Sequence, residues 1–466
     1  MSKQAAQSTT NQITEGVIWK QLLIFFFPIL FGTFFQQLYN TADAIIVGNF
    51  VGKEALASVG GSASTIINLL VGFFVGLSSG ATVIISQYYG ADNRRRVSDS
   101  VHTAIALAIA GGVVIMLIGL VSARFALTAM GTPDDILSLS LTYMKIYYLG
   151  TIPSMIYNMG SGILRAVGDS KRPLYFLIAS CLVNIVLDLL FVAVLDMGVA
   201  GAAIATIASQ FFSAILTLIA LLRTQDSYRL IVSKIRFHRD LLFDIIKIGL
   251  PAGLQSAMYS ISNLLIQSSI NSFGTDTIAA WTAYGKVDSI FWMIMGAYGV
   301  SITTFAGQNF GAGKYDRIKK MCPHLSRSCC CDQPFFSALS FEFGGTILLL
   351  FTRDANVINI CIGMMRVVSP AYITYICIEI LSRYLPRLRG FPFFPDAADP
   401  ALGVCVLRIL WITIAVPLRH EVATVAFSYP LTWTITSILF ILYYKRGKWM
   451  QKDTLRNAPQ GQGKDA

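Results

Sequence analysis

The sequence predicts an all-α integral membrane protein whose twelve transmembrane helices form two six-helix bundles in a parallel repeat. The first observation is composition: 55% of the 466 residues are apolar, 13% are charged, and the mean hydropathy is +0.62. Soluble domains carry about 25% charged residues, so this composition indicates a polytopic membrane protein. The second observation is a series of apolar segments of spanning length. These predicted spans are 18–47, 54–87, 98–123, 136–160, 173–195, 199–222, 243–272, 277–308, 319–351, 357–381, 398–417 and 424–444.

Basic residues in the loops predict how the chain is oriented. The loops on one side carry only Lys53, Arg124, Arg353 and Arg419. The positive-inside rule therefore places the other side, with both termini, in the cytoplasm. Because the basic residues serve orientation, the net charge of +11 does not indicate nucleic-acid binding. The basic residues of the cytoplasmic side are Arg94, Arg95, Arg96, Arg165, Lys171, Arg172, Arg223, Arg229, Lys234, Arg236, Arg239, Lys314, Arg317, Lys319, Lys320, Lys445, Arg446 and Lys448.

The third observation is an internal repeat. SQYYGADNRRRV at 86–97 matches GQNFGAGKYDRI at 307–318 at an offset of 221 residues, and Phe27-Pro28 resembles Leu250-Pro251. Six spans followed by six in the same orientation predict two lobes related by an axis along the membrane normal, as in secondary transporters. The expected division is a cytoplasmic N-terminus at 1–17, an N-lobe at 18–222, a cytoplasmic linker at 223–242, a C-lobe at 243–444 and a cytoplasmic tail at 445–466.

Polar residues inside the spans of the first half predict a binding site. Asn184 and Asp188 lie four residues apart in an apolar run, so a helix places both on one face. A carboxylate at the bilayer centre costs roughly 2.5–3.5 kcal/mol, so it is seldom found there without a partner or a task. At 1.5 Å per residue from the turn near Gly198, Asp188 and Thr206 lie about 12–15 Å below the outer loop, and Asp43 lies at a similar depth. These oxygens suit a hard monovalent cation or a proton; a structural polar pair between helices is the alternative.

These residues resemble the multidrug and toxic compound extrusion (MATE) family of transporters. The resemblance covers nearly the whole chain and rests on FPILFGTFFQQLYNTADAIIVGNFVG at 27–52, SGILRAVGDSKRP at 161–173, the Asn184–Asp188 pair and AGQNFGAGKYDRI at 306–318. It implies a V-shaped pair of six-helix bundles in the bacterial cytoplasmic membrane. It also implies export of amphipathic, often cationic, compounds in exchange for sodium or protons. The bacterial branches with an acidic cation site in the N-terminal lobe are the most similar.

The resemblance implies site residues position by position. Pro28 matches the proline at which the first helix bends, and Tyr143 and Asn158 match positions that line the N-lobe cavity. Another branch has an acidic residue in the seventh helix, but this chain has Tyr259 near that position. The implied cation-coupling residues are Asp43, Asn184, Asp188, Ala202 and Thr206.

Contacts to a transported compound are expected from polar side chains buried among the helices. Methionines such as Met258, Met293 and Met295 would add an adaptable wall. The expected polar residues are Gln36, Gln37, Tyr39, Asn40, Tyr143, Asn158 and Gln210. In the C-lobe, Asp288 and Glu379 are expected either to pair structurally with other charges or to form a second polar site. The other membrane-level charges of that lobe are Arg366 and Arg408.

Two stretches of the second half break the pattern, CPHLSRSCCCDQPF at 322–335 and RYLPRLRGFPFFPDAADP at 383–400. The spacing of Cys322, His324 and Cys329 is loosely ligand-like, but three successive cysteines cannot all face one metal, so no structural metal is expected. A pair of short, later corrected reading-frame shifts accounts better for both stretches. The neighbouring frames would read ARICLAVAVATSLF and GTFRAFGDSLFPMLLTL, and the second restores the pattern of residues 162–170.

The absence of a GxxxxGK[ST] loop in the sequence indicates that an ion gradient supplies the energy. The sequence therefore predicts a monomeric, cation-coupled multidrug exporter without enzymatic activity or bound cofactor, with transient sodium possible at Asp43 and Asp188. Sodium and protons remain alternatives for the coupling ion. Two alternatives to the exporter are a lipid-linked saccharide flippase, which would need a cationic cavity, and a frameshift-damaged, inactive transporter.

Overall fold

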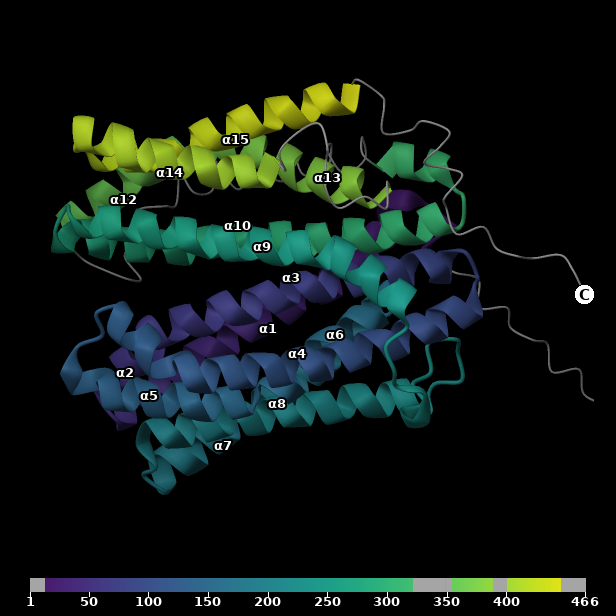
Figure 1. Cartoon of the computed structure of the whole chain (residues 1–466). Coiled ribbons are helices and arrows are strands. Elements are labelled where there is room, and N and C mark those ends of the chain that lie inside the picture. Colours follow the sequence, from purple (N-terminus) through teal and green to yellow (C-terminus); the bar gives the residue numbers. More distant parts are fainter. Residues whose placement is uncertain (1–12, 322–347, 349–353, 389–399, 446–466) are drawn as a thin grey trace, which may run out of the picture.

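The computed structural model describes residues 13–321, 348, 354–388 and 400–445, and these residues are almost entirely helical. The helices form two lobes that lie side by side along a common direction (Figure 1). Among the described residues, nine helices are long and apolar enough to cross a membrane. Large apolar side chains such as Val121, Phe125 and Leu418 are more than three-quarters exposed, as expected for surfaces that face lipid.

The first lobe is built from eight α-helices and one short π-helix, η1. Their bounds are α1 Ile18–Phe50, α2 Lys53–Gly60, α3 Ser62–Gly90, α4 Arg94–Ala129, α5 Asp134–Leu149, α6 Thr151–Ala166, α7 Lys171–Asp188, η1 Leu189–Val194 and α8 Gly198–Arg223.

The second lobe follows a connection that contains a short 3-10 helix, η2. The elements of this part are η2 Val232–Lys234, α9 Arg239–Asn271, α10 Thr275–Gly311, α12 Ala355–Val368, η3 Ser369–Ala371, α13 Tyr372–Leu388, α14 Pro400–Leu418 and α15 Val422–Lys445. The first residues of α1 and the last residues of α15 lie on the right-hand side of the molecule in Figure 1. This end also carries Arg94, Arg95 and Arg96 at the start of α4, the connection 224–238 and the loop 312–314, and it is called the basic end below.

The helices agree with the predicted spans except at four interruptions. The second span breaks at Gly61 into α2 and α3, and the fourth breaks at Gly150 into α5 and α6. The fifth span ends in η1, and the tenth is divided by η3. The predicted ninth span and the anomalous stretch 322–335 lie outside the described residues, apart from 319–321 and 348. Of the second anomalous stretch, α13 continues to Leu388, and residues 389–399 lie outside the described part.

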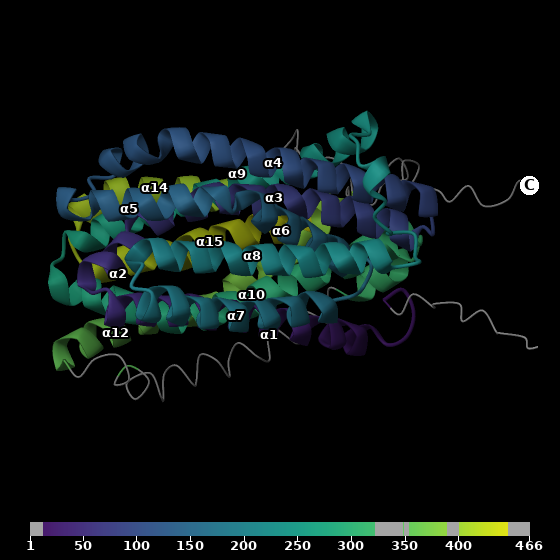
Figure 2. The ribbon, with the colours of Figure 1, turned by 90° about the horizontal axis from the view of Figure 1, so that it is seen from below.

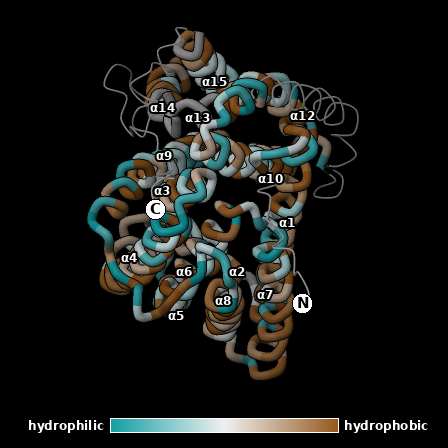
Figure 3. Tube along the Cα trace, turned by 90° about the vertical axis from the view of Figure 1, so that its right-hand side faces the viewer, coloured by the Kyte–Doolittle hydropathy of each residue, from teal (hydrophilic) through white to brown (hydrophobic). Residues whose placement is uncertain are grey.

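Two helices begin in one lobe and end in the other. Leu22, Phe25 and Phe26 at the start of α1 belong to the apolar core of the second lobe, whereas Ile46 and Val47 near its end belong to the core of the first. The ring of Phe26 stacks on Tyr298 of α10 with centroids 4.2 Å apart. Figure 3 shows α1 between α7 and α10, and α1 contacts both helices. Figure 2 shows the same helices from below.

The helix α9 makes the opposite crossing. Leu241 and Ile245 at its start belong to the core of the first lobe, and Ile266 and Ile270 near its end belong to the core of the second. Each crossing helix contains an internal proline, Pro28 in α1 and Pro251 in α9. Proline removes one backbone hydrogen bond and disfavours a straight helix, so it suits the region where each helix changes partners. The similarity of Phe27-Pro28 and Leu250-Pro251 therefore corresponds to a shared structural role.

Glycines allow the two lobes to approach each other along α3 and α9. A methyl group on Gly80 would lie 2.3 Å from the carbonyl oxygen of Ile245, and one on Gly249 would lie 2.2 Å from the carbonyl oxygen of Leu77. Gly76 and Gly253 form a similar contact further along the same pair of helices. Small residues that let backbones touch are the usual basis of tight helix packing in membranes.

We expect Gly80→Ala to destabilise the protein by about 1–3 kcal/mol, because the new methyl group meets backbone that cannot rotate away. The thermal unfolding midpoint of the purified protein in detergent measures this. Gly296→Ala is the matched control, since Gly296 is also helical and nothing lies within 4 Å of a methyl group there. Equal midpoints for the two variants would contradict the described packing of α3 on α9.

Candidate functional site

The candidate cation site of the first lobe is formed by α1, α7 and α8. Asp43 comes from α1, Asn184 and Asp188 come from α7, and Thr206 comes from α8. Asn184 and Asp188 are completely buried, and Asp43 is 8% exposed. The structure thus brings together the side chains that the sequence placed at similar depths.

The two carboxylates lie close enough for the charge of Asp43 to act on Asp188. The hydroxyl groups of Tyr39 and Tyr143 lie within electrostatic range of both carboxylates. The hydroxyl of Thr206 donates to the carbonyl oxygen of the buried Ala202 at 3.0 Å, one turn earlier in α8. Oxygen atoms from four kinds of group therefore converge on one buried position.

Several polar atoms of this cluster have no hydrogen-bond partner among the described residues. They are Asp43 Oδ1, both carboxylate oxygens of Asp188, and both amide atoms of Asn184. A buried carboxylate without a partner is strongly disfavoured unless it is neutralised. Carboxylate, amide and hydroxyl oxygens are the ligands that hard cations prefer. The donor set consequently fits a small monovalent cation, and the carboxylates equally fit a proton.

The backbone next to Asp188 departs from the regular helix on which the depth count relied. From Leu189 the chain continues as the π-helix η1, which runs to Val194 before the turn at Gly198. Extra residues in a π-turn change the direction in which the preceding side chains point. The count of ten residues from Gly198, at the rise of a regular α-helix, therefore does not describe the backbone between Asp188 and the turn.

Aromatic and amide side chains line the same region on α5, α6 and α8. The rings of Tyr143 and Tyr147 lie 6.2 Å apart, and Gln210 donates to the Tyr147 hydroxyl at 3.4 Å. Asn158 donates to the carbonyl oxygen of Ser154 at 2.8 Å, one turn back in α6. Tyr147 was missed by sequence reasoning, although its spacing of four residues from Tyr143 places both on one helix face.

Three of the polar residues predicted to be buried are exposed, which corrects that prediction. Gln36, Gln37 and Asn40 are exposed on α1, and Tyr39 is half-buried. Asn40 and Gln36 lie one and two turns before Asp43 on the same face, so they extend from the buried site toward an accessible surface. Gln37 lies on the neighbouring face and accepts from Asn40 at 3.5 Å.

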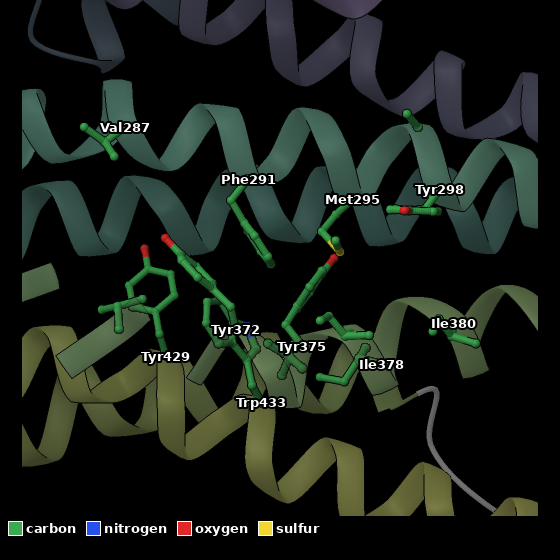
Figure 4. Close-up of a cluster of buried hydrophobic side chains, with 14 of the residues drawn as sticks. Val287, Phe291, Met295, Tyr298, Tyr372, Tyr375, Ile378, Ile380, Tyr429 and Trp433 are labelled. Atoms are coloured by element: carbon green, nitrogen blue, oxygen red, sulfur yellow. The ribbon is translucent and has the colours of Figure 1, made fainter. Parts of the chain in front are cut away.

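The acidic residue of the second lobe, Asp288, has a different environment. Its carboxylate accepts hydrogen bonds from Trp292 at 2.7 Å, from Tyr284 at 3.3 Å and from Tyr372. Tyr372 belongs to the buried aromatic cluster of Figure 4, where it stacks on Phe291 with centroids 3.8 Å apart. Three donors therefore satisfy Asp288 through the protein itself.

A buried arginine lies near Asp288, and its Nε and Nη2 have no hydrogen-bond partner among the described residues. This residue, Arg408 of α14, is 2% exposed, lies 4.2 Å from the ring centroid of Tyr429, and is close enough for its charge to act on Asp288. Glu379 is buried and accepts from Tyr375 at 3.1 Å, whereas Arg366 is exposed. Asp288 and Glu379 thus each accept hydrogen bonds from neighbouring side chains of the same lobe.

No group of three or more His, Cys, Asp or Glu side chains that could hold a metal occurs in the described part of the chain. Cys322, His324 and Cys329 lie outside that part. The convergence of Asp43 and Asp188 thus remains the principal candidate for ion binding.

Known proteins match this chain over most of its length. The MatE family model matches residues 28–190 and 251–387. "Probable multidrug resistance protein YoeA" of Bacillus subtilis is 26% identical over 460 residues, 96% of this chain and 97% of the relative. "Multidrug export protein MepA" of Staphylococcus aureus is 22% identical over 353 residues, 76% of this chain and 78% of the relative. A solved structure described as the outward-facing conformation of a multidrug resistance MATE family transporter covers 95% of this chain and 99% of its own, with a TM-score of 0.85 and 21% identity.

We expect Asp288→Asn to lower the free energy of unfolding by about 1–3 kcal/mol, because an amide has one oxygen to accept the hydrogen bonds that Trp292, Tyr284 and Tyr372 donate to the two carboxylate oxygens. Thermal unfolding in detergent measures the loss. Asp316→Asn is the matched control, since Asp316 belongs to the same half of the chain and its side chain is 90% exposed. An Asp288→Asn variant as stable as this control would argue against the described hydrogen bonds.

Proposed function

Because the chain belongs to the MatE family of multidrug efflux transporters, we propose that it is a cation-coupled antiporter that exports amphipathic, cationic compounds. The observation that carries the proposal is the pair of buried carboxylates, Asp43 and Asp188, in which Oδ1 of Asp43 and both oxygens of Asp188 have no hydrogen-bond partner among the described residues. An ion gradient can drive transport only if a cation binds within the membrane, and this pair supplies a place for one. The protein is a multi-pass membrane protein rather than an enzyme.

Chemical complementarity supports a cationic substrate. The buried cluster is acidic, and Tyr39, Tyr143 and Tyr147 surround it with aromatic rings. Organic cations bind favourably to aromatic faces and to carboxylates. Gln36 and Asn40, exposed on the same helix face as Asp43, would provide polar contacts on the path to the site.

The coupling would follow from competition for the same negative charge. A proton or a sodium ion at Asp43 and Asp188 neutralises the cluster and weakens its attraction for a cationic compound. A ligand shifts a conformational equilibrium only by its difference in affinity for the two states. Exchange therefore requires that the cation and the exported compound favour opposite arrangements of the lobes, and α1 is placed to link them because it packs in both cores.

The positive-inside rule supports an orientation with the basic end in the cytoplasm. The acidic cluster lies toward the opposite, outer end, beyond the middle of α1 and near the end of α7. Loading of the cation from outside and release of the exported compound to the outside would then use one opening. We further propose that the protein acts as a monomer.

We expect Asp188→Asn to abolish coupled export, because the change removes one of the two charges on which a cation depends. Drug resistance of a sensitised bacterial host at equal expression measures this, together with uptake into inverted vesicles. Asp196→Asn is the matched control, since Asp196 lies on the exposed turn after η1. Near wild-type resistance with Asp188→Asn would refute the site, and failure of the parent protein to export would favour the damaged-transporter alternative.

The coupling ion is open to a direct measurement. We expect efflux to depend either on sodium at fixed pH or on the pH difference without sodium, and Asp43→Asn to remove whichever dependence the parent shows. Efflux that proceeds equally without either gradient would contradict cation coupling.

A further inference from the structure

The repeated motif at 86–97 and 307–318 lies where the two lobes meet at the basic end. A methyl group on Gly90 would lie 2.0 Å from the carbonyl oxygen of Gln308, and one on Gly311 would lie 1.8 Å from the carbonyl oxygen of Gln87. The ends of α3 and α10 therefore cross in backbone contact, and each glycine fits against the other copy of the motif. Gln308 also donates across the interface to the carbonyl oxygen of Ala166 at 2.6 Å.

The arginine that ends the second copy of the motif holds the segment in front of α1. Nη1 of Arg317 donates to the carbonyl oxygen of Gly16 at 2.8 Å, and Nη2 donates to those of Glu15 at 3.2 Å and Ile13 at 3.4 Å. Its Nε donates to Oδ1 of Asn309 at 3.1 Å, which orients the guanidinium. A residue of the second half of the chain thus fixes the entry into the first helix.

Neighbours of Arg317 reinforce the same contact. Lys314 donates to the carbonyl oxygen of Thr14 at 3.0 Å, and the amide of Asn309 donates to that of Ile13 at 3.4 Å. The backbone of residues 13–16 is consequently bound by three side chains from the end of α10 and the loop that follows. A planar guanidinium has several N–H groups, so it can donate hydrogen bonds to adjacent carbonyl oxygens at the same time.

The arginine at the equivalent position of the first copy makes the symmetric contact. Arg96, 221 residues before Arg317, forms an ion pair with Asp240 at the start of α9. Asn93 orients this region because its side chain caps α4 through the amide of Arg96 at 3.1 Å. Each arginine therefore holds the start of the helix that crosses from its own lobe to the other one.

We propose that Arg96 and Arg317 are paired positioning residues of the transport cycle, which keep the basic end closed by holding the start of α9 on the first lobe and the start of α1 on the second. The proposal rests on the proposed transport function only in assigning the closed end to the cytoplasm. Asp43 lies in the second half of α1. The hydrogen bonds from Arg317 to the residues just before α1 therefore also connect the helix of the cation site to the second lobe. Releasing the start of α1 would open the basic end without altering the acidic cluster.

The two contacts should differ in strength. Arg317 donates to three backbone carbonyl oxygens and is partly buried, whereas Arg96 and Asp240 form an ion pair between side chains that are 43% and 58% exposed. Exposed ion pairs contribute little and are screened by salt. Loss of Arg317 is therefore expected to have the larger effect, and only the effect of Arg96 should fall when the salt concentration is raised.

Cysteine labelling tests the proposal without any assumption about drug or cation. Ser86 is completely buried beside Gly307 at the lobe interface, so Ser86→Cys reports opening of the basic end. We expect Arg317→Ala to raise the rate of maleimide labelling of this cysteine in lipid nanodiscs at least tenfold. The labelling of the native cysteines, measured in the same variant without Ser86→Cys, is subtracted. Arg96→Ala should raise the labelling rate by a smaller factor, and the double variant should exceed both.

The controls remove a positive charge close to each arginine in the sequence. Arg95→Ala, within the first copy of the motif, and Lys320→Ala, two residues after the second, change exposed residues and should leave the labelling rate unchanged. Labelling of Arg317→Ala and Arg96→Ala within twofold of these controls would overturn the proposal. Arg317→Lys keeps the charge but loses the fork, so it should give an intermediate rate, and it replaces Arg317→Ala if that variant is not monodisperse. Raised labelling of the arginine variants, together with export that does not depend on a cation, would support the role of the two arginines and refute cation coupling. Unchanged labelling, together with cation-dependent export, would support cation coupling and refute the role of the two arginines.

Discussion

A carboxylate removed from water must find donors, a counter-charge or a proton, and the two lobes meet this requirement differently. In the second lobe, Trp292 and two tyrosines donate to Asp288, and Arg408 supplies the opposite charge. In the first lobe, the oxygens of Asp188 have no such partner among the described residues. The first arrangement is stable in one state, whereas the second needs an ion that arrives and leaves. Only the second arrangement can therefore respond to an ion gradient.

Binding of an ion at Asp188 can move the lobes relative to each other only if a structural element connects the ion site to both lobes. The crossing helix α1 provides this connection, because its start packs with Tyr298 of the second lobe and its end carries Asp43 into the first. The helix α9 crosses in the opposite direction, and the glycine contact of Gly80 with Ile245 keeps it against α3. The lobes are thus joined by two helices that each belong to both cores, which makes a relative rotation of the lobes a cooperative event.

The sequence predicted the helices, and the burial of two acidic residues within them, better than it predicted the surroundings of those residues. Apolar length determines a membrane helix, and a carboxylate inside an apolar segment is rare enough to be conspicuous, so Asp43 and Asp188 were recognisable. The π-helix after Asp188 was not, because its residues, Leu189 to Val194, are apolar like those of any regular span. The exposure of Gln36 could not be predicted either, since it depends on how far neighbouring helices stand from α1. The passage of α1 and α9 from one core to the other likewise depends on tertiary packing.

The repeat shows which features both halves must share. The glycine, the glutamine and the arginine of the motif recur at an offset of 221 because the contact between the lobes is itself symmetric: Gly90 faces Gln308, and Gly311 faces Gln87. A change in one copy alters its own contact and the surface that the other copy requires. The interior of each lobe has no such reciprocal partner, so the first lobe could keep buried carboxylate oxygens without hydrogen-bond donors while the second enclosed Asp288 with aromatic donors. Symmetry at the interface and asymmetry in the interiors thus have one physical cause, which is that only the interface is shared.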